Sequence, residues 1–197
     1  MDIAGKKIAI LATHGFEQSE LLVPLRRLKE VGAQVEIVSP EEGKLRGWNH
    51  DDWGEKVDVD VRLSEAEPEQ YEALVLPGGQ INPDLLRINP DAVKFVRAFY
   101  DANKPIAAIC HAPWLLIEAG LVRGLRATSY PSVKTDMINA GADWVDEPVV
   151  EDNAIITSRK PADLDAFCTK LTEELSRGIH VKRQRPQAAA GREAGLH

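Results

Sequence analysis

The apolar positions near the start of the chain predict a strand, a helix and a second strand. Apolar runs at 8–12 and 35–38 have the length of buried strands. Between them, the apolar residues from Leu21 to Val31 recur at helical spacing, and Gly32 then favours a stop. Pro24 is tolerated in such a helix only near its start. The right-handed crossover of a βαβ unit implies a parallel sheet.

The same alternation of strands and helices continues to about residue 175. Asn89-Pro90 supplies an N-cap and a first-turn proline for a further helix. Residues beyond 177 show no apolar period, so we expect one α/β domain over 1–177 and a flexible C-terminal tail over 178–197. The remaining predicted strands are 73–76, 104–109 and 154–158. Of the remaining predicted helices, one begins after Asn89, one begins after Cys110 and one spans 163–175.

The stretch from Gly43 to Asp60 breaks this alternation. It holds the run Trp48-Asn49-His50-Asp51-Asp52-Trp53, and we expect an excursion or hairpin outside the main sheet. Its aromatic side chains, Trp48 and Trp53 with His50, would form a pocket wall or a subunit contact. A metal site at His50 is disfavoured because no companion ligands surround it in the sequence.

Composition and charge narrow the function classes. The chain has 197 residues and a formal net charge of −7, which disfavours a broad nucleic-acid-binding face. No apolar run reaches the roughly 20 residues of a membrane helix, and the N-terminus lacks a signal-peptide core, so we expect a cytoplasmic protein without a membrane partner. The two cysteines, Cys110 and Cys168, have neither disulfide nor zinc spacing, which fits a reduced compartment.

Unusual residues follow three of the predicted strands. They are Thr13-His14-Gly15-Phe16-Glu17, Pro77-Gly78-Gly79 and Cys110-His111, and in a doubly wound sheet the carboxyl ends of the strands collect ligands. A cysteine between a strand and a helix N-terminus is expected to have a lowered pKa and to be reactive. The alternative is a small buried hydrophobe. Cys168 shares helical spacing with apolar neighbours, so we expect it to be unreactive core.

The neighbours of Cys110 suggest supporting roles. His111 is a candidate general acid or base, although adjacent residues on a helix do not face one another. The backbone amides of Gly79 and His111 could form an oxyanion hole. Glu17 could be protonated and donate a hydrogen bond to the thiolate, or it could be a surface carboxylate at a helix start.

Four segments together resemble the ThiJ/PfpI family of the class I glutamine amidotransferase-like superfamily. The resemblance runs in order over about residues 6 to 176 and implies a flavodoxin-like three-layer α/β/α sandwich with a mostly parallel sheet. It also implies homodimers or larger homo-oligomers, and no cofactor. The segments are Glu17 after the first strand, Leu76-Pro77-Gly78-Gly79, Ala108-Ile109-Cys110-His111-Ala112-Pro113, and Thr157 to Leu164 before the last helix.

By this resemblance the nucleophile falls on Cys110, its hydrogen-bonding acid on Glu17 and the adjacent histidine on His111. The oxyanion-hole amides fall on Gly79 and His111. A carboxylate of the neighbouring subunit, at the position of Asp84, would orient His111, which makes the site a property of the dimer. Asp84 is shorter than the Glu of some relatives.

The residues after the histidine depart from the family pattern. Pro113-Trp114 replaces the Gly and Gln that often follow it, so the indole of Trp114 would narrow the pocket or pack within the helix.

Three functions use these residues. The first is a stress-protective, cofactor-independent cysteine enzyme of glyoxalase or deglycase type, in which the thiol adds to reactive carbonyls or glycated groups. The second is an intracellular cysteine peptidase acting on small peptides. The third is a non-enzymatic redox sensor or chaperone that uses the same thiol. Amidotransferase activity is disfavoured, since no synthase domain and no late Cys-His-Glu set are present.

Overall fold

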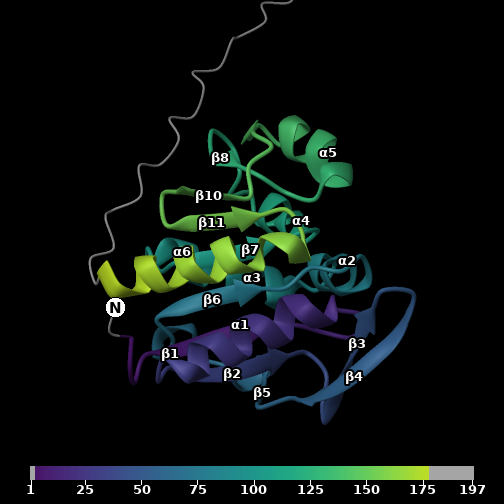
Figure 1. Cartoon of the computed structure of the whole chain (residues 1–197), viewed down its shortest axis with the longest axis vertical. Coiled ribbons are helices and arrows are strands. Elements are labelled where there is room, and N and C mark those ends of the chain that lie inside the picture. Colours follow the sequence, from purple (N-terminus) through teal and green to yellow (C-terminus); the bar gives the residue numbers. More distant parts are fainter. Residues whose placement is uncertain (1–2, 178–197) are drawn as a thin grey trace, which may run out of the picture.

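A central sheet organises residues 3–177, the part of the chain that this computed structural model describes (Figure 1). Within that part the sheet has seven strands in the order β10-β11-β7-β6-β1-β2-β5. All neighbouring pairs are parallel except β10 with β11, which forms an antiparallel edge. The strands are β1 (Lys7–Leu11), β2 (Gln34–Ser39), β5 (Val61–Arg62), β6 (Ala73–Leu76), β7 (Ile106–Ile109), β10 (Val149–Asp152) and β11 (Ile155–Ser158).

Helices cover both faces of the sheet, which explains why its central strands β6 and β7 are apolar throughout. Every residue of β6, β7 and β11 is buried, as expected for parallel strands covered on two sides. The inner strands follow the order β2-β1-β6-β7-β11, which is the flavodoxin-like arrangement. The predicted three-layer α/β/α fold with a mostly parallel sheet is therefore confirmed.

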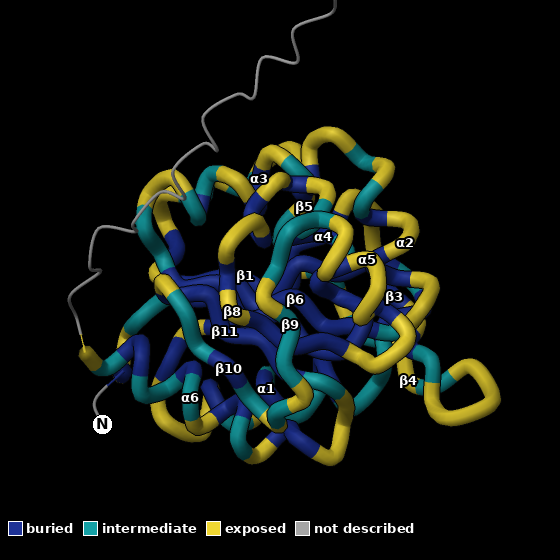
Figure 2. Tube along the Cα trace, turned by 90° about the horizontal axis from the view of Figure 1, so that it is seen from above, coloured by how far each residue is buried: buried dark blue, intermediate teal, exposed yellow. Residues whose placement is uncertain are grey.

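The two faces carry separate apolar cores. On one face, α1 (Gln18–Glu30) and α6 (Leu164–Arg177) pack through residues such as Leu21 and Phe167. On the other, α3 (Pro90–Asp101) and α4 (Pro113–Glu118) pack through residues such as Phe99 and Leu115. Figure 2 shows the buried strands between exposed outer segments. The shorter elements are α2 (Ile81–Arg87), α5 (Lys134–Asn139), β8 (Arg126–Ala127), β9 (Asp143–Trp144), and 3₁₀ turns at Leu63–Glu65, Pro68–Gln70, Pro131–Val133 and Pro161–Asp163.

The predicted excursion is a separate hairpin. β3 (Lys44–Asn49) and β4 (Asp52–Asp58) pair antiparallel in a two-stranded sheet of their own. The backbone joins this hairpin to the loop after β1, because Gly15 N–H donates to Arg46 O at 2.8 Å and Trp48 N–H donates to Phe16 O at 2.7 Å. The hairpin therefore borders the carboxyl edge of the sheet.

Two local predictions can be compared with the helices. Asn89 caps α3, since its side chain accepts hydrogen bonds from the backbone N–H groups of Asp91 and Ala92. The expectation that Pro24 lies near a helix start is wrong, because α1 begins at Gln18 and Pro24 is buried in its interior. The predicted tail over 178–197 lies outside the described residues. No helix within residues 3–177 is long and apolar enough to cross a membrane.

Candidate functional site

Three loops meet at the carboxyl edge of the sheet, around the neighbouring strands β1, β6 and β7. In doubly wound folds this is the crevice that binds ligands. The loops enclose a cavity of about 510 Å³. Its lining includes Glu17, Gly79, Cys110 and His111, so the structure brings these four predicted site residues together.

Cys110 occupies the turn between β7 and α4. Its backbone φ is +65°, in the left-handed region that residues with a side chain rarely adopt. Two hydrogen bonds hold this conformation: Cys110 N–H donates to Ser158 O at 3.0 Å, and Tyr130 N–H donates to Cys110 O at 2.8 Å. Such strain persists only where the surroundings impose it, and it is concentrated at functional sites.

The glycine pair brings backbone amides to the sulfur. Gly79 has φ +81°, and a Cβ on it would lie 2.5 Å from the carbonyl oxygen of Gly15, so the position admits only glycine. The backbone amides of Gly79 and His111 both hydrogen-bond the Cys110 side chain, and these bonds lower its pKa. The two amides predicted for an oxyanion hole thus point at the sulfur.

The carboxyl next to the thiol belongs to Glu20. Glu20 has no exposed surface, and its Oε2 accepts a hydrogen bond from Gly78 N–H at 2.9 Å. Its carboxyl also interacts with the Cys110 side chain. The assignment of this contact to Glu17 is corrected, because Glu17 lies half-buried in the cavity wall and its Oε1 accepts from Ser19 Oγ at 3.1 Å.

Burial keeps Glu20 protonated. Desolvation is the largest cause that raises its pKa to about 8. Oε1 is buried and has no partner at hydrogen-bond geometry, so the neutral acid has a proton to offer at this oxygen. A sequence signal for Glu20 existed: it precedes Pro24 by four residues and Leu28 by eight, on the buried stripe of α1.

The surroundings of the Cys110 thiol disfavour its thiolate. Burial is the main cause that raises its pKa, followed by the negative charge of Glu20 when that group is ionised. The pKa of Cys110 is therefore raised, and not lowered as expected from a cysteine at a helix N-terminus. α4 begins only at Pro113 and is six residues long.

The imidazole of His111 lies within hydrogen-bond distance of that thiol. Its Nδ1 lies 3.1 Å from Cys110 Sγ, and its Nε2 lies 3.2 Å from Ser132 Oγ. Burial lowers the pKa of His111, which favours the neutral ring. If Nδ1 accepts the thiol proton, Nε2 carries the ring hydrogen and donates it to Ser132. Ser132 was not predicted, since 21 residues separate it from His111.

Aromatic rings fix the plane of His111. Tyr130 stacks on the imidazole with 4.7 Å between ring centroids, and Trp114 meets it edge-on at 5.1 Å. Trp114 Nε1 donates to Asp136 Oδ2 at 2.9 Å. Trp114 is not part of the cavity lining, so the prediction that it walls the pocket is wrong, and its indole packs against the His111 ring.

The hairpin supplies one wall of the cavity. Trp48 and His50 line it, as expected, whereas Trp53 lies on a neighbouring cavity and contacts Trp48 edge-on at 5.5 Å between centroids. Trp53 is therefore corrected from a wall residue to a support behind Trp48. Asp84 is exposed on α2 and makes no hydrogen bond or ion pair with another described residue.

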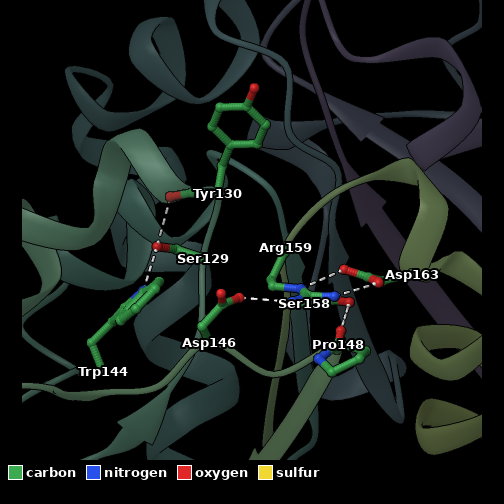
Figure 3. Close-up of polar contacts among 8 residues, drawn as sticks. All are labelled: Ser129, Tyr130, Trp144, Asp146, Pro148, Ser158, Arg159 and Asp163. Atoms are coloured by element: carbon green, nitrogen blue, oxygen red, sulfur yellow. Dashed lines mark hydrogen bonds and ion pairs between the residues drawn. The ribbon is translucent and has the colours of Figure 1, made fainter.

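Polar contacts below the cavity hold Tyr130 and the turn before α6 (Figure 3). Trp144 Nε1 donates to Ser129 Oγ at 2.9 Å, and Ser129 Oγ donates to the carbonyl of Tyr130 at 3.0 Å. Arg159 bridges the loop after β9 to this turn through Asp146 at 2.7 Å and Asp163 at 2.9 and 3.0 Å. The turn includes Pro161, a residue of the cavity wall. Ser158 Oγ also donates to Pro148 O.

The second cysteine lies away from this site. Cys168 is 3% exposed in the core under α6, and burial raises its pKa to about 11. Among the described residues, no three His, Cys, Asp or Glu side chains are grouped to hold a metal ion.

Comparisons with known proteins agree with this geometry. The model of the DJ-1/PfpI family matches residues 6–174. The chain is 42% identical over 169 residues to Deglycase PfpI of Pyrococcus furiosus, covering 86% of this chain and 99% of that protein. It is 42% identical over 162 residues to Putative cysteine protease YraA of Bacillus subtilis, covering 82% and 94%.

A solved structure shows the same arrangement. Drosophila melanogaster DJ-1beta superposes with a TM-score of 0.79 at 28% identity, over 87% of this chain and 90% of that one. Sequence and fold agree, and the chain belongs to the DJ-1/PfpI family.

Proposed function

We propose that this protein is a cysteine-dependent enzyme that acts on reactive carbonyl compounds or glycated groups, the activity suggested by the name of its relative Deglycase PfpI. The observation that carries the proposal is the Cys110 Sγ to His111 Nδ1 distance of 3.1 Å inside a cavity that also holds the buried Glu20. Nucleophile, base and neutral acid thus surround one atom.

The first chemical step follows from these contacts. As Cys110 Sγ forms a bond to the carbonyl carbon, the thiol proton moves to His111 Nδ1 and the C=O π pair moves to oxygen. The amides of Gly79 and His111, which hydrogen-bond the Cys110 side chain, would donate to the developing oxyanion. Return of the proton from Nδ1 to that oxygen completes a neutral hemithioacetal. As the thiol proton moves to His111, the protonated Glu20 carboxyl would donate to the negative charge that develops on sulfur.

The proposed enzyme is a homodimer or a larger homo-oligomer. Asp84 of a neighbouring copy would then lie near the cavity mouth, as the resemblance implies, and contribute to the orientation of His111. The exposure of Asp84 within one copy of the chain supports a role between copies.

A cysteine peptidase is the second candidate. The relative YraA carries the name of a putative cysteine protease, and the Cys110–His111 pair would serve an acyl transfer as well as an addition to an aldehyde. The cavity of about 510 Å³, with Trp48 and His50 in its wall, favours a small carbonyl compound over a peptide segment.

One assay series separates these activities. The parent protein, Cys110→Ser and Cys168→Ser are each incubated with methylglyoxal, a methylglyoxal-glycated amine and a fluorogenic peptide. We expect the parent and Cys168→Ser to consume the first two compounds, and Cys110→Ser to be inactive. Preferential cleavage of the peptide would replace the proposal by the peptidase. Absence of turnover on all three, with selective peroxide oxidation of Cys110, would replace it by a redox sensor.

A further inference from the structure

A second cavity, of about 340 Å³, lies on the hairpin beside the thiol cavity. His14, Lys44, Arg46, Trp53 and Lys56 line it, and we call it the basic groove. Three of these five side chains, Lys44, Arg46 and Lys56, carry a positive charge, in a chain whose net charge is −7 with histidines neutral. Such a local excess of positive charge against the overall sign concentrates anions.

The cations of the groove are poorly neutralised by the protein. Arg46 and Lys56 are direct cross-strand partners in the β3–β4 register, and like charges in that arrangement repel. Lys44 is paired with Asp58 at 3.1 Å. In the part of the chain that the structure describes, neither Arg46 nor Lys56 forms an ion pair with a carboxylate. The hairpin thus maintains a repulsive pair that an anion would relieve.

His14 adds a hydrogen-bond donor. Its Nδ1 accepts the backbone N–H of Arg46 at 3.1 Å, so in the neutral ring the proton is on Nε2. The Arg46 guanidinium lies 5.7 Å from the centroid of the Trp53 ring, which limits its movement. A guanidinium, an ammonium and an imidazole N–H together suit the several acceptor oxygens of a phosphate group.

The groove adjoins the thiol cavity through two shared elements. His14 lines the groove and the next residue, Gly15, lines the thiol cavity. Trp53 lines the groove and Trp48 lines the thiol cavity, and these two rings are in edge contact. A small molecule with an anionic end could therefore have its reactive end near Cys110.

We propose that the basic groove binds the phosphate group of phosphorylated carbonyl compounds or phosphorylated glycated compounds. This inference rests on the proposed function for its reactive end, because the substrate class is defined by both cavities together. Arg46 and Lys56 supply charge, His14 supplies a directed N–H, and the Trp48–Trp53 pair separates the phosphate from the thiol. The phosphate takes no part in the bond changes at sulfur.

Binding is tested first, without catalysis. Two proteins are compared by calorimetric titration: Cys110→Ser, and Cys110→Ser that also carries Arg46→Gln and Lys56→Gln. Each is titrated with glycerol 3-phosphate, with glycerol and with glycerate. The matched control is Arg26→Gln/Lys29→Gln, which removes the same charge from two exposed positions on α1. We expect glycerol 3-phosphate to bind, glycerol not to bind, and each lost charge at the groove to weaken binding about tenfold.

Catalysis is tested second, with glyceraldehyde 3-phosphate and glyceraldehyde as a matched pair. The groove variant should raise KM for the phosphorylated aldehyde alone and leave kcat unchanged. Glycerol 3-phosphate binding that is equal in the groove variant and the control overturns the proposal, as does glycerate binding as tight as phosphate binding. If phosphate binding depends on the groove but the protein turns over no aldehyde, the phosphate site is supported and the proposed function is rejected. A failure of the phosphate site can therefore be distinguished from a failure of the proposed function.

Discussion

At the residue scale, the buried Glu20 couples stability to pH. Its pKa is about 8 in the folded protein against 4.5 for a free carboxyl. Between these values the unfolded chain loses the proton and the folded chain keeps it. The stabilising effect is therefore complete below about pH 4.5 and is lost as the pH rises through about 8.

Glu20→Gln should remove this dependence. In the parent, Glu20 is expected to lower the free energy of unfolding by up to about 1.4 kcal/mol per pH unit across the window, and Glu20→Gln should lack this contribution to the slope. Urea denaturation at a series of pH values measures both slopes. Glu30→Gln, at an exposed glutamate of the same helix, is the matched control and should keep the parental slope. A parental slope in Glu20→Gln would show that Glu20 does not titrate in this window.

Ser132 is expected to matter for activity through His111. Removing its hydroxyl in Ser132→Ala leaves Nε2 without its partner at 3.2 Å, so the ring is held less firmly against the thiol. Because a neutral hydrogen bond contributes about 0.5–1.5 kcal/mol, kcat/KM and the rate of Cys110 alkylation should fall roughly three- to tenfold.

Two further variants test this assignment. Ser132→Thr keeps the hydroxyl and should retain most of the activity. Asp84→Asn tests the carboxylate of a neighbouring copy. If Ser132→Ala leaves kcat/KM unchanged and Asp84→Asn lowers it strongly, the orientation of His111 is assigned to the other subunit.

At the element scale, the turn after β6 has the least tolerance for change. Both Gly79 and Gly43 have positive φ, +81° and +76°, but only Gly79 is crowded, since a Cβ at Gly43 meets no atom within 4 Å. Gly43→Ala should cost about 1–2 kcal/mol from backbone strain. Gly79→Ala should cost roughly 1–3 kcal/mol more from overpacking against the Gly15 carbonyl.

The pair of glycine variants is compared by urea denaturation and by turnover. Gly79→Ala should also lose activity, since its amide is displaced from the Cys110 sulfur, whereas Gly43→Ala should remain active. Equal losses of stability in the two variants would mean that positive φ, and not crowding, sets the requirement for glycine.

The elements also show which features the sequence could predict. The inner strands were predictable because strands buried on both faces are apolar throughout, as in Ala73–Leu76. α2 was not, because Asn82-Pro83 interrupts any apolar period there, although proline is compatible with the first turn of a helix. Glu20 was missed because apolar spacing placed the helix start at Leu21. Contacts between distant segments, such as Ser132 with His111, leave no local pattern.

At the scale of the whole molecule, α2 presents an apolar surface to solvent. Ile81, Leu85 and Ile88 are 38%, 44% and 76% exposed on this one helix, and Asp84 is exposed among them. Exposed apolar side chains that gather in this way are typical of association surfaces. The surface also adjoins the thiol cavity, whose wall includes Ile81.

Charge on this surface should dissociate the expected oligomer. Sedimentation velocity of Leu85→Arg/Ile88→Arg is expected to give monomers, and the parent should give dimers or larger assemblies. Val31→Arg, at a 45% exposed apolar residue next to α1, is the control and should sediment as the parent does. A monomeric parent would contradict the prediction and would leave the site as a property of one chain.

The β3–β4 hairpin has a consequence for how this enzyme could diversify. It forms a sheet separate from the one that carries Cys110, yet it supplies Trp48 and His50 to the cavity wall. Under the proposed function, the residues that select the substrate and the residues that react with it therefore lie in different segments of the chain. Exchange of residues 44–58 for another hairpin would change the substrate specificity and leave the residues around Cys110 in place. Paralogues with one chemistry and different substrates can therefore arise by change in this segment alone.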